Sequence, residues 1–468
     1  MLSNHSDEIP ANSNQKNTSQ KYIIFLWMII ALITIGSGVF NHYSIKKNVS
    51  TVHTEPKMEK APTTIIMTGR YVLGAKFFYL TMGTQESDDQ YRNLVLQLEN
   101  YCRNVTDQTI IVPFIAELAG QDAVKDYIAR LKKDPGLSES LLIDLDTFQK
   151  IYENGPDTLE QSEYERLIDR HQWIAKVALS FGLPSSDPFR IEVMKPAQRT
   201  FIVFIVFMSA ILMSGTAGFI LLIITTIMLF NKRLSVGFPA DQIPGVFTES
   251  AFLETTALFL VAITVMNVIG GFLPRILFWF LYLFLTVAAI FWPLLRGMNL
   301  KSLMVALGWH KGKGIFREIG SGFVGYLAGL PIIICGAVVT LIIVKYSGVQ
   351  PVHPIVHQFR DAGFWKIARL LLLACVMAPI LEETLFRGAF YRHLRIRHSV
   401  FLSTMLSGLI FAVIHPQGFA AFPALASLGA VFALIREWRG SLIGSVVAHA
   451  LNNFAVTMLL VLTIYNTG

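Results

Sequence analysis

Long apolar runs alternate with short polar segments along most of this 468-residue chain. A helix needs about 20 mainly apolar residues to cross the hydrocarbon core of a bilayer. Nine segments approach or exceed that length, two of them short, and they are residues 22–40, 201–230, 252–272, 276–295, 320–344, 370–391, 401–415, 419–435 and 442–464. The pattern predicts an all-α, polytopic membrane helix bundle of about nine spans.

The pattern changes between the first and second of these segments. From about residue 63 to residue 195, apolar residues recur at spacings of three and four and are interrupted by Pro and Gly. This is typical of short amphipathic helices, expected here at residues 94–105, 114–133, 137–155 and 159–183. We predict a soluble, all-helical domain over residues 41–199, for which a binding or regulatory role is the default because no nucleophile or metal motif is visible.

The other divisions follow from these limits. Residues 1–21 are polar and are expected to form a disordered tail. Residues 22–40 are interpreted as a signal anchor, because they follow that tail and lack a small-residue cleavage site. Residues 200–298 are expected to be accessory spans, and residues 299–468 a membrane domain that holds the candidate chemistry.

Composition and charge support this division and predict an orientation. A hydrophobic content of 53% and a mean hydropathy of +0.51 exceed those of a soluble protein. Residues 51–199 hold 17 Lys and Arg against 22 Asp and Glu, a net of −5, which leaves 22 against 10, or +12, elsewhere. With nine alternating spans, the basic loops all fall on one side, as the excess of Lys and Arg in cytoplasmic loops requires. This predicts a cytoplasmic N-terminus, an extracytoplasmic position for residues 41–199, and no nucleic-acid partner.

Several apparent motifs are interpreted as structural. Gly320, Gly322 and Gly325 spell GxGxxG, but they open a membrane span rather than follow a strand, so we expect them to permit close helix packing. His353 and His357 are four residues apart in a loop that contains proline, where a solvated pair is more common than a metal site. The three cysteines show no paired spacing, so no disulfide framework is predicted.

Two adjacent carboxylates, Glu382 and Glu383, lie inside an apolar segment. A charged side chain at membrane depth costs roughly 2.5 to 3.5 kcal/mol, so it normally faces the protein interior or water and marks a functional site. If the chain turns near residue 398 to form a helical hairpin, His415 returns to the depth of the two glutamates. His449 reaches a similar depth, because it lies ten residues beyond the basic boundary at Arg439.

Spacing within each helix groups these residues further. Glu383 and Arg387 are i,i+4 and can form an ion pair, which leaves Glu382 about 100° round the helix and free to hold a water molecule. His449 and Asn453 are also i,i+4 and would face the same cavity. A single buried Glu or His usually belongs to an inert packing network, but ionisable residues from three spans at one depth favour a functional site.

Three motifs carried by these spans resemble those of the CPBP (CAAX protease and bacteriocin-processing, or Abi) family of intramembrane proteases. Glu382-Glu383-Thr-Leu-Phe-Arg387 is similar to EExxxR, Phe411-Ala-Val-Ile-His415 to FxxxH, and His449-Ala-Leu-Asn452-Asn453 to HxxxN, in the family's order. The resemblance covers residues 300–465 and makes residues 299–468 a CPBP-like catalytic domain. It implies hydrolysis of a peptide bond in a membrane-associated, including CAAX-like, protein or peptide, and a prokaryotic plasma membrane as the location.

The resemblance also implies a role for each site residue. Glu382 would be the general base for an attacking water molecule that His415 helps to hold, and Arg387 would keep Glu383 ionised. His449 and Asn453 would donate hydrogen bonds to the oxyanion of the tetrahedral intermediate. Glu382, His415 and His449 are also acceptable ligands for one zinc ion, so a divalent metal stays open. The absence of HExxH, and Asn453 as a poor zinc ligand but a good donor, favour catalysis without a cofactor.

Functions of other classes stay open as well. Buried Glu, His and Arg residues also build proton relays in transporters, and helices broken at Pro379 or Pro416 could expose a transport site. No second copy of the motif segment indicates the inverted repeats common in transporters. An inactive membrane scaffold with a binding domain outside is a third interpretation. The absence of HExxH, GxGD and GxSxG motifs disfavours the other intramembrane protease classes.

Overall fold

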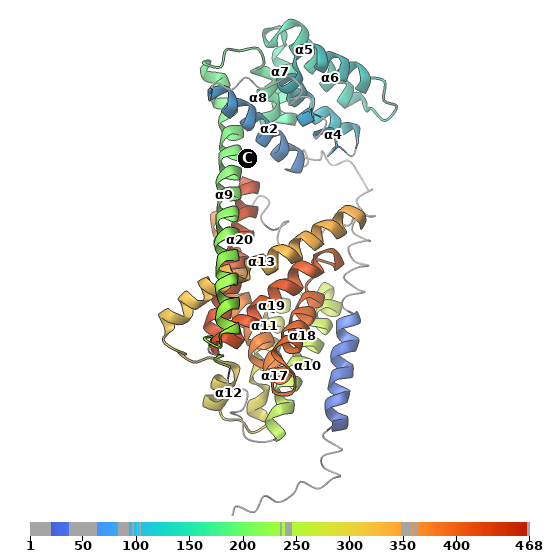
Figure 1. Cartoon of the computed structure of the whole chain (residues 1–468). Coiled ribbons are helices and arrows are strands. Elements are labelled where there is room, and N and C mark those ends of the chain that lie inside the picture. Colours follow the sequence, from blue (N-terminus) through green and yellow to red (C-terminus); the bar gives the residue numbers. More distant parts are fainter. Residues whose placement is uncertain are drawn as a thin grey trace, which may run out of the picture. The chain divides into compact units, whose positions relative to one another are not determined.

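The computed structural model describes residues 20–36, 63–82, 93–95, 98–100, 102, 104–234, 236–238, 246–347, 358 and 363–465. Every regular element in these ranges is helical (Figure 1), as the apolar and amphipathic patterns predict. The chain divides into two compact units. Unit 1 holds Met1–His53 and Met213–Thr457, and unit 2 holds Thr54–Leu212 and Met458–Gly468.

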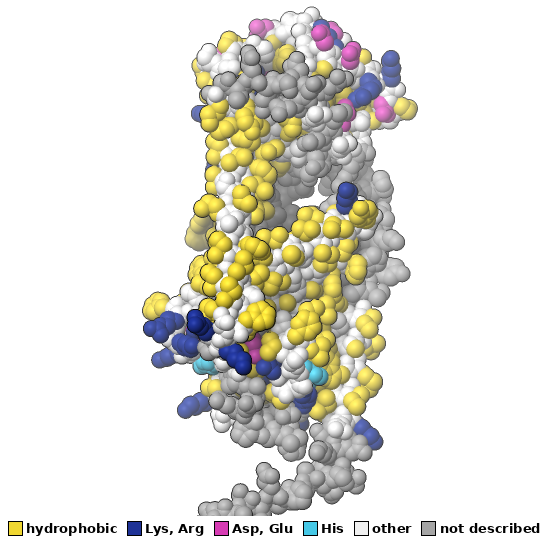
Figure 2. Space-filling model, in the orientation of Figure 1, with side chains coloured by type: hydrophobic (Ala, Val, Ile, Leu, Met, Phe, Trp, Pro, Cys, Tyr) yellow, Lys and Arg dark blue, Asp and Glu magenta, His cyan; other side chains and the backbone are white. Residues whose placement is uncertain are grey.

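Within the described ranges, seven helices are long and apolar enough to cross a membrane. The other two predicted spans coincide with apolar helices of fewer than 18 residues, Gln20–Gly36 and Val400–Ile414. The seven long helices are Pro188–Phe230, Ser250–Phe272, Arg275–Leu295, Ile315–Ser347, Phe364–Arg397, Phe419–Arg439 and Leu442–Leu459. The chain is therefore a helical membrane protein, and its large exposed apolar surface (Figure 2) matches contact with lipid rather than water.

Unit 1 is built from helices and short helical turns. In chain order they are the second half of α9 (Pro188–Phe230), α10 (Val246–Ile269), η2 (Gly270–Phe272), α11 (Arg275–Leu295), α12 (Leu300–Leu307), α13 (Ile315–Ser347), α15 (Phe364–Leu372), η3 (Leu373–Met377), α16 (Ala378–Glu383), η4 (Thr384–Phe390), α17 (Tyr391–Arg397), α18 (Val400–Ile414), η5 (Phe419–Ala421), α19 (Phe422–Arg439) and α20 (Leu442–Tyr465). Apolar side chains of α10, α11, α12 and η4 form one core, onto which the helix Gln20–Gly36 packs through Leu26 and Ile30.

Small residues let α13 lie close to α19 and α20. A Cβ atom added to Gly322 would come within 2.7 Å of the Gly444 carbonyl oxygen, and one added to Gly329 within 2.3 Å of a Val431 methyl carbon. Gly325 is equally close to Ile435, at 2.8 Å. These contacts confirm that the glycine-rich segment serves helix packing rather than nucleotide binding.

Unit 2 is an assembly of short helices around its own apolar core. It contains α2 (Thr63–Thr81), α4 (Val105–Ile110), α5 (Val112–Leu131), α6 (Glu139–Asn154), η1 (Pro156–Thr158), α7 (Gln161–His171), α8 (Trp173–Leu179) and the first half of α9. Capping side chains fix where α6 and α7 begin. Ser138 accepts a hydrogen bond from the Leu141 amide before α6, and Glu160 forms a capping box with Glu163 at the start of α7. A buried ion pair with Nη2 to Oε2 at 2.8 Å joins Arg190 of α9 to Glu117 of α5.

The sequence patterns locate most of these helices, with three differences. The helix α2 was not predicted, whereas three of the four predicted amphipathic segments coincide with α5, α6 and α7 together with α8. Residues 96, 97, 101 and 103 of the predicted segment 94–105 lie outside the described residues, as do His353 and His357. The helix α9 continues without a break through residue 199, where the sequence suggested a domain limit.

Candidate active site

One continuous helical stretch from α15 to α17 carries the glutamate pair. The i,i+5 bonding of a π-helix replaces that of the α-helix at η3 and at η4, one on each side of the short α16 that ends at Glu383. Such π turns are rare and occur mostly at functional sites. The stretch ends at Arg397, and Ser399 caps α18 by accepting from the Leu402 amide, which confirms the predicted turn near residue 398.

The ion pair between Glu383 and Arg387 lies at the centre of the site. Arg387 Nη1 is 2.9 Å from Glu383 Oε1, and both side chains are fully buried. Arg387 Nη2 donates to the Gly429 carbonyl of α19 at 2.8 Å. The guanidinium carbon is also 4.6 Å from the centre of the Phe411 ring and 5.3 Å from that of Phe432. The pair therefore ties η4 to α18 and α19 and balances its own charge.

The His449 ring is fixed from two sides. Its Nδ1 is 2.9 Å from Glu383 Oε1, and a carboxylate accepts, so Nδ1 carries the proton. The Phe432 ring stacks on the imidazole with centroids 4.8 Å apart and an interplanar angle of 23°. This arrangement leaves Nε2 directed at Glu382, with Oε2 3.8 Å away.

His415 is held in the same manner at the end of α18. Its Nδ1 bonds to the Phe411 carbonyl oxygen, which can only accept, and its ring lies 4.2 Å from the Phe411 ring. Phe411 therefore forms a wall of the site. The His415 Nε2 atom is 3.6 Å from Glu382 Oε2.

Glu382 Oε2 thus faces the Nε2 atoms of both histidines, because each ring is held through its Nδ1 atom. The distances of 3.6 and 3.8 Å are too long for direct hydrogen bonds. The Oε2 atom is buried without a hydrogen-bond partner within the described part of the chain, yet the Glu382 side chain as a whole is 28% exposed. The Glu382 carboxylate and the His415 Nε2 atom can both accept a hydrogen bond, which suits a water molecule with two protons to donate.

Asn453 occupies a different position from the one expected. Its amide nitrogen donates to the Ala374 carbonyl oxygen of η3 at 2.8 Å, and its oxygen lies 3.4 Å from the Asn452 amide nitrogen. No hydrogen bond joins the Asn453 side chain to the side chain of Glu382 or His449 among the described residues. Asn453 therefore anchors α20 to the π turn that precedes the glutamates, and only its second N–H is available to a ligand.

Phe432 and Gly429 of α19 contact His449 and Arg387, and the sequence did not predict either contact. A Cβ atom on Gly429 would lie 2.9 Å from Gly408 Cα and 3.2 Å from Arg387 Nη2, so glycine is needed for this close approach. Trp309 is a third, since its indole N–H donates to the Thr384 hydroxyl at 3.0 Å, directly after the glutamate pair. None of these residues belongs to a motif, and only proximity between distant segments reveals them.

The donor atoms of Glu382, His415 and His449 are of types that zinc binds. Within the described ranges, however, no group of three or more His, Cys, Asp or Glu side chains has an arrangement that could hold a metal ion.

The comparisons with known proteins agree with the position of the site. Residues 364–455 match the family model described as type II CAAX prenyl endopeptidase Rce1-like. The comparison with curated proteins gave no match, and neither did the comparison with solved structures. The matched residues include both glutamates, both histidines and the arginine of the site. Residues 364–455 of this helical membrane protein are thus a domain of the Rce1-like type II CAAX prenyl endopeptidase family, a family of proteases.

Proposed function

We propose that this domain hydrolyses a peptide bond of a membrane-associated protein or peptide, with Glu382 as the general base. The observation that carries the proposal is the position of Glu382 Oε2, 3.6 Å from His415 Nε2 and 3.8 Å from His449 Nε2. The neighbouring Glu383 uses Oε1 for both Arg387 and His449 and is fully buried, whereas the Glu382 side chain is 28% exposed, so Glu382 is the carboxylate that water can reach.

The reaction follows from the donors and acceptors of the site. A water molecule between Glu382 and His415 gives one proton to Glu382 while its oxygen attacks the scissile carbonyl carbon. The C=O double bond becomes a single bond, and the oxyanion accepts a hydrogen bond from the Nε2–H of His449. Glu382 then returns its proton to the leaving nitrogen as the C–N bond breaks. The second N–H of Asn453 is a further candidate donor to the oxyanion.

We also propose the topology and location that the charge pattern supports. The helices Gln20–Gly36 and Val400–Ile414 would be the two short spans of nine, which gives a cytoplasmic N-terminus and an extracytoplasmic unit 2. The membrane would be a prokaryotic plasma membrane, and CAAX-like proteins are one candidate class of substrate. The basic ends of α17 and α19 would then face the cytoplasm.

The test compares membranes from cells that produce the wild type or Glu382→Gln, by quantitative proteomics of protein termini. Glu382→Gln keeps the size of the side chain but cannot accept the proton, so termini generated by the wild type should disappear. A matched control is Glu165→Gln, because Glu165 is exposed in unit 2 and contacts only Gln161 among the described residues.

Expression level and thermal unfolding of the three proteins must agree for the comparison to count. Equal sets of termini in wild type and Glu382→Gln would refute the protease proposal. Proton flux into proteoliposomes without any cleavage would favour the transporter, and neither activity would favour the scaffold.

A further inference from the structure

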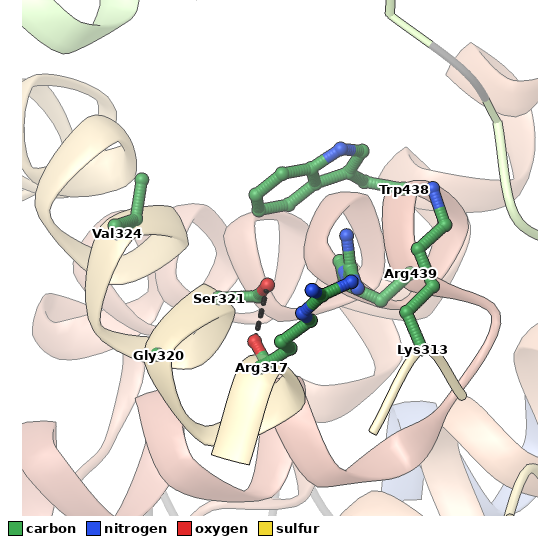
Figure 3. Close-up of a pocket in the computed structure, with 7 residues that line it drawn as sticks. All are labelled: Lys313, Arg317, Gly320, Ser321, Val324, Trp438 and Arg439. Atoms are coloured by element: carbon green, nitrogen blue, oxygen red, sulfur yellow. Dashed lines mark hydrogen bonds between the residues drawn. The ribbon is translucent and has the colours of Figure 1, made fainter. Parts of the chain in front are cut away.

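A pocket outside the candidate active site lies where α13 begins and α19 ends. Its volume is about 380 Å³, and it is lined by Lys313, Arg317, Gly320, Ser321, Val324, Trp438 and Arg439 (Figure 3). All seven residues belong to unit 1. Of the lining residues, only Trp438 and Arg439 of α19 belong to residues 364–455, which carry the active-site motifs.

The cationic ends of three of these side chains gather on one side of the pocket. Arg439 is balanced by Glu318, which is fully buried and bonded to it at 2.9 and 2.6 Å. Arg317 is exposed and makes no ion pair with any described residue, and only its backbone carbonyl is bonded, by the Ser321 hydroxyl. Arg317 therefore brings to the pocket a positive charge that is unpaired within the described residues, because the adjacent Glu318 is already paired with Arg439.

The opposite side of the pocket is apolar. Val324 lies two helical turns beyond Arg317, further into the apolar helix, and the Trp438 indole lies between this side and the cations (Figure 3). A Cβ atom added to Gly320 would meet nothing within 4 Å, so the space above that residue is open. Cations at the helix ends, a tryptophan at the boundary and an apolar wall beyond it reproduce the polarity profile of a phospholipid.

The surface around the pocket shows the same change from cationic to apolar side chains. Lys and Arg side chains gather at one end of the apolar surface of unit 1 (Figure 2). The long apolar helices α13 and α19 begin and end at that level, at Ile315 and Arg439. The pocket thus lies where the phosphate layer of a bilayer is expected.

We propose that this pocket binds the headgroup of an anionic phospholipid, with its phosphate at Arg317 and Lys313 and the start of an acyl chain along Gly320 and Val324. Lys and Arg at a membrane surface each strengthen binding to anionic lipid by roughly fivefold. Replacing both cations should therefore weaken binding by roughly thirtyfold.

The test measures binding of phosphatidylglycerol to the purified full chain by native mass spectrometry, with phosphatidylcholine of the same chain length for comparison. Two kinds of variant separate charge from space. Lys313→Gln with Arg317→Gln removes the cations, and Gly320→Leu fills the open space without changing any charge. Lys301→Gln is the matched control, because Lys301 is an exposed lysine of α12 that does not line the pocket.

We expect both kinds of variant to lose phosphatidylglycerol selectively, and Lys301→Gln to bind as the wild type does. Unchanged binding in the double variant or in Gly320→Leu would overturn the proposal. So would inorganic phosphate that binds as tightly as the lipid and is insensitive to Gly320→Leu, since that marks a site for a free anion. If the double variant fails to fold, as judged by thermal unfolding, Gly320→Leu decides alone.

Discussion

Glu383 and Arg387, one helical turn apart, form an ion pair at 2.9 Å in which both side chains are completely buried. Loss of one partner leaves the other charge buried and unpaired, which typically costs about 3–5 kcal/mol, whereas loss of both charges costs less. We expect Arg387→Met to lower the unfolding temperature more than the double variant Arg387→Met with Glu383→Gln does. Thermal unfolding of the purified proteins in one detergent measures the difference. Strictly additive effects would show that the two charges do not depend on each other.

Phe432 is expected to position His449 without taking part in the reaction. The ring stacks on the imidazole at 4.8 Å, and a displaced catalytic group can lose roughly a hundredfold in rate. Phe432→Leu should therefore lower kcat by roughly ten- to a hundredfold and change KM little. A peptide from a substrate found by proteomics serves for the assay. Leu434→Ala, an exposed position on the same helix, should have normal kinetics, and an equal loss in both variants would contradict the prediction.

Gly429 should tolerate no side chain. A methyl group there would lie 2.9 Å from Gly408 Cα and 3.2 Å from Arg387 Nη2, so Gly429→Ala should destabilise the protein by about 1–3 kcal/mol and reduce cleavage. Gly320→Ala is the matched control, because the added Cβ meets nothing within 4 Å and alanine favours the helix. Comparison of the two unfolding temperatures tests this, and a similar fall in both would show that helix packing at Gly429 is not tight.

His310, between α12 and α13, should make stability depend on pH. Its Nε2 donates to the Gly440 carbonyl at 3.0 Å and its Nδ1 accepts from the Gly312 amide at 3.2 Å, so the bonded form is neutral. Burial, helped by the nearby charge of Arg436, lowers the pKa of His310 below its ordinary value of 6.5. The unfolded chain therefore binds a proton at a higher pH, so this part of the stability is fully present above pH 6.5 and is lost progressively as pH falls below 6.5 toward the lower pKa of the folded state.

The measurement for His310 compares wild type with His310→Gln, whose amide can make both hydrogen bonds but does not titrate. Between pH 7.5 and about 5.5, the unfolding temperature of the wild type should fall further than that of the variant. Parallel curves would mean that His310 contributes nothing to the pH dependence.

Catalysis is expected to continue after metal removal. Because the sequence has no HExxH motif and Asn453 is a poor zinc ligand but a good hydrogen-bond donor, dialysis against a chelator should leave the cleavage rate unchanged. Elemental analysis of the purified protein checks the same point independently. One zinc ion per chain, with activity lost on chelation and restored by zinc, would show that Glu382, His415 and His449 are ligands.

Part of the site could be read from spacing, because a helix has a fixed rise and a fixed number of residues per turn. The i,i+4 spacing of Glu383 and Arg387 predicted their ion pair. A turn near residue 398 predicted that His415 lies at the same membrane depth as the glutamates. The structure has this turn, since Ser399 caps the start of α18, and His415 lies 3.6 Å from Glu382. Apolar run length likewise gave the seven long helices.

Other features depended on contacts between segments far apart in the chain. The helix α2, which was not predicted, approaches α9 so closely that a Cβ atom on Gly74 would lie 2.2 Å from the Ala197 carbonyl oxygen. Asn453 shares a helix face with His449, yet its amide is bound by the Ala374 carbonyl that the π turn η3 presents. The stacking of Phe432 on His449 and the approach of Gly429 to Arg387 also have no local signal.

The sequence by itself determined that the chain forms membrane helices and that acidic, basic and imidazole groups from three of them reach one depth, because these properties follow from hydropathy and helical geometry. The i,i+4 spacing also indicated that Glu383 pairs with Arg387 and that Glu382 does not. Only the tertiary structure decided which groups hold that pair and what Glu382 faces. Gly429 admits Arg387 to the interior, Phe432 holds His449 against Glu383, and Glu382 is left facing two imidazole nitrogens. These contacts join segments far apart in the chain, and no spacing along the chain specifies them.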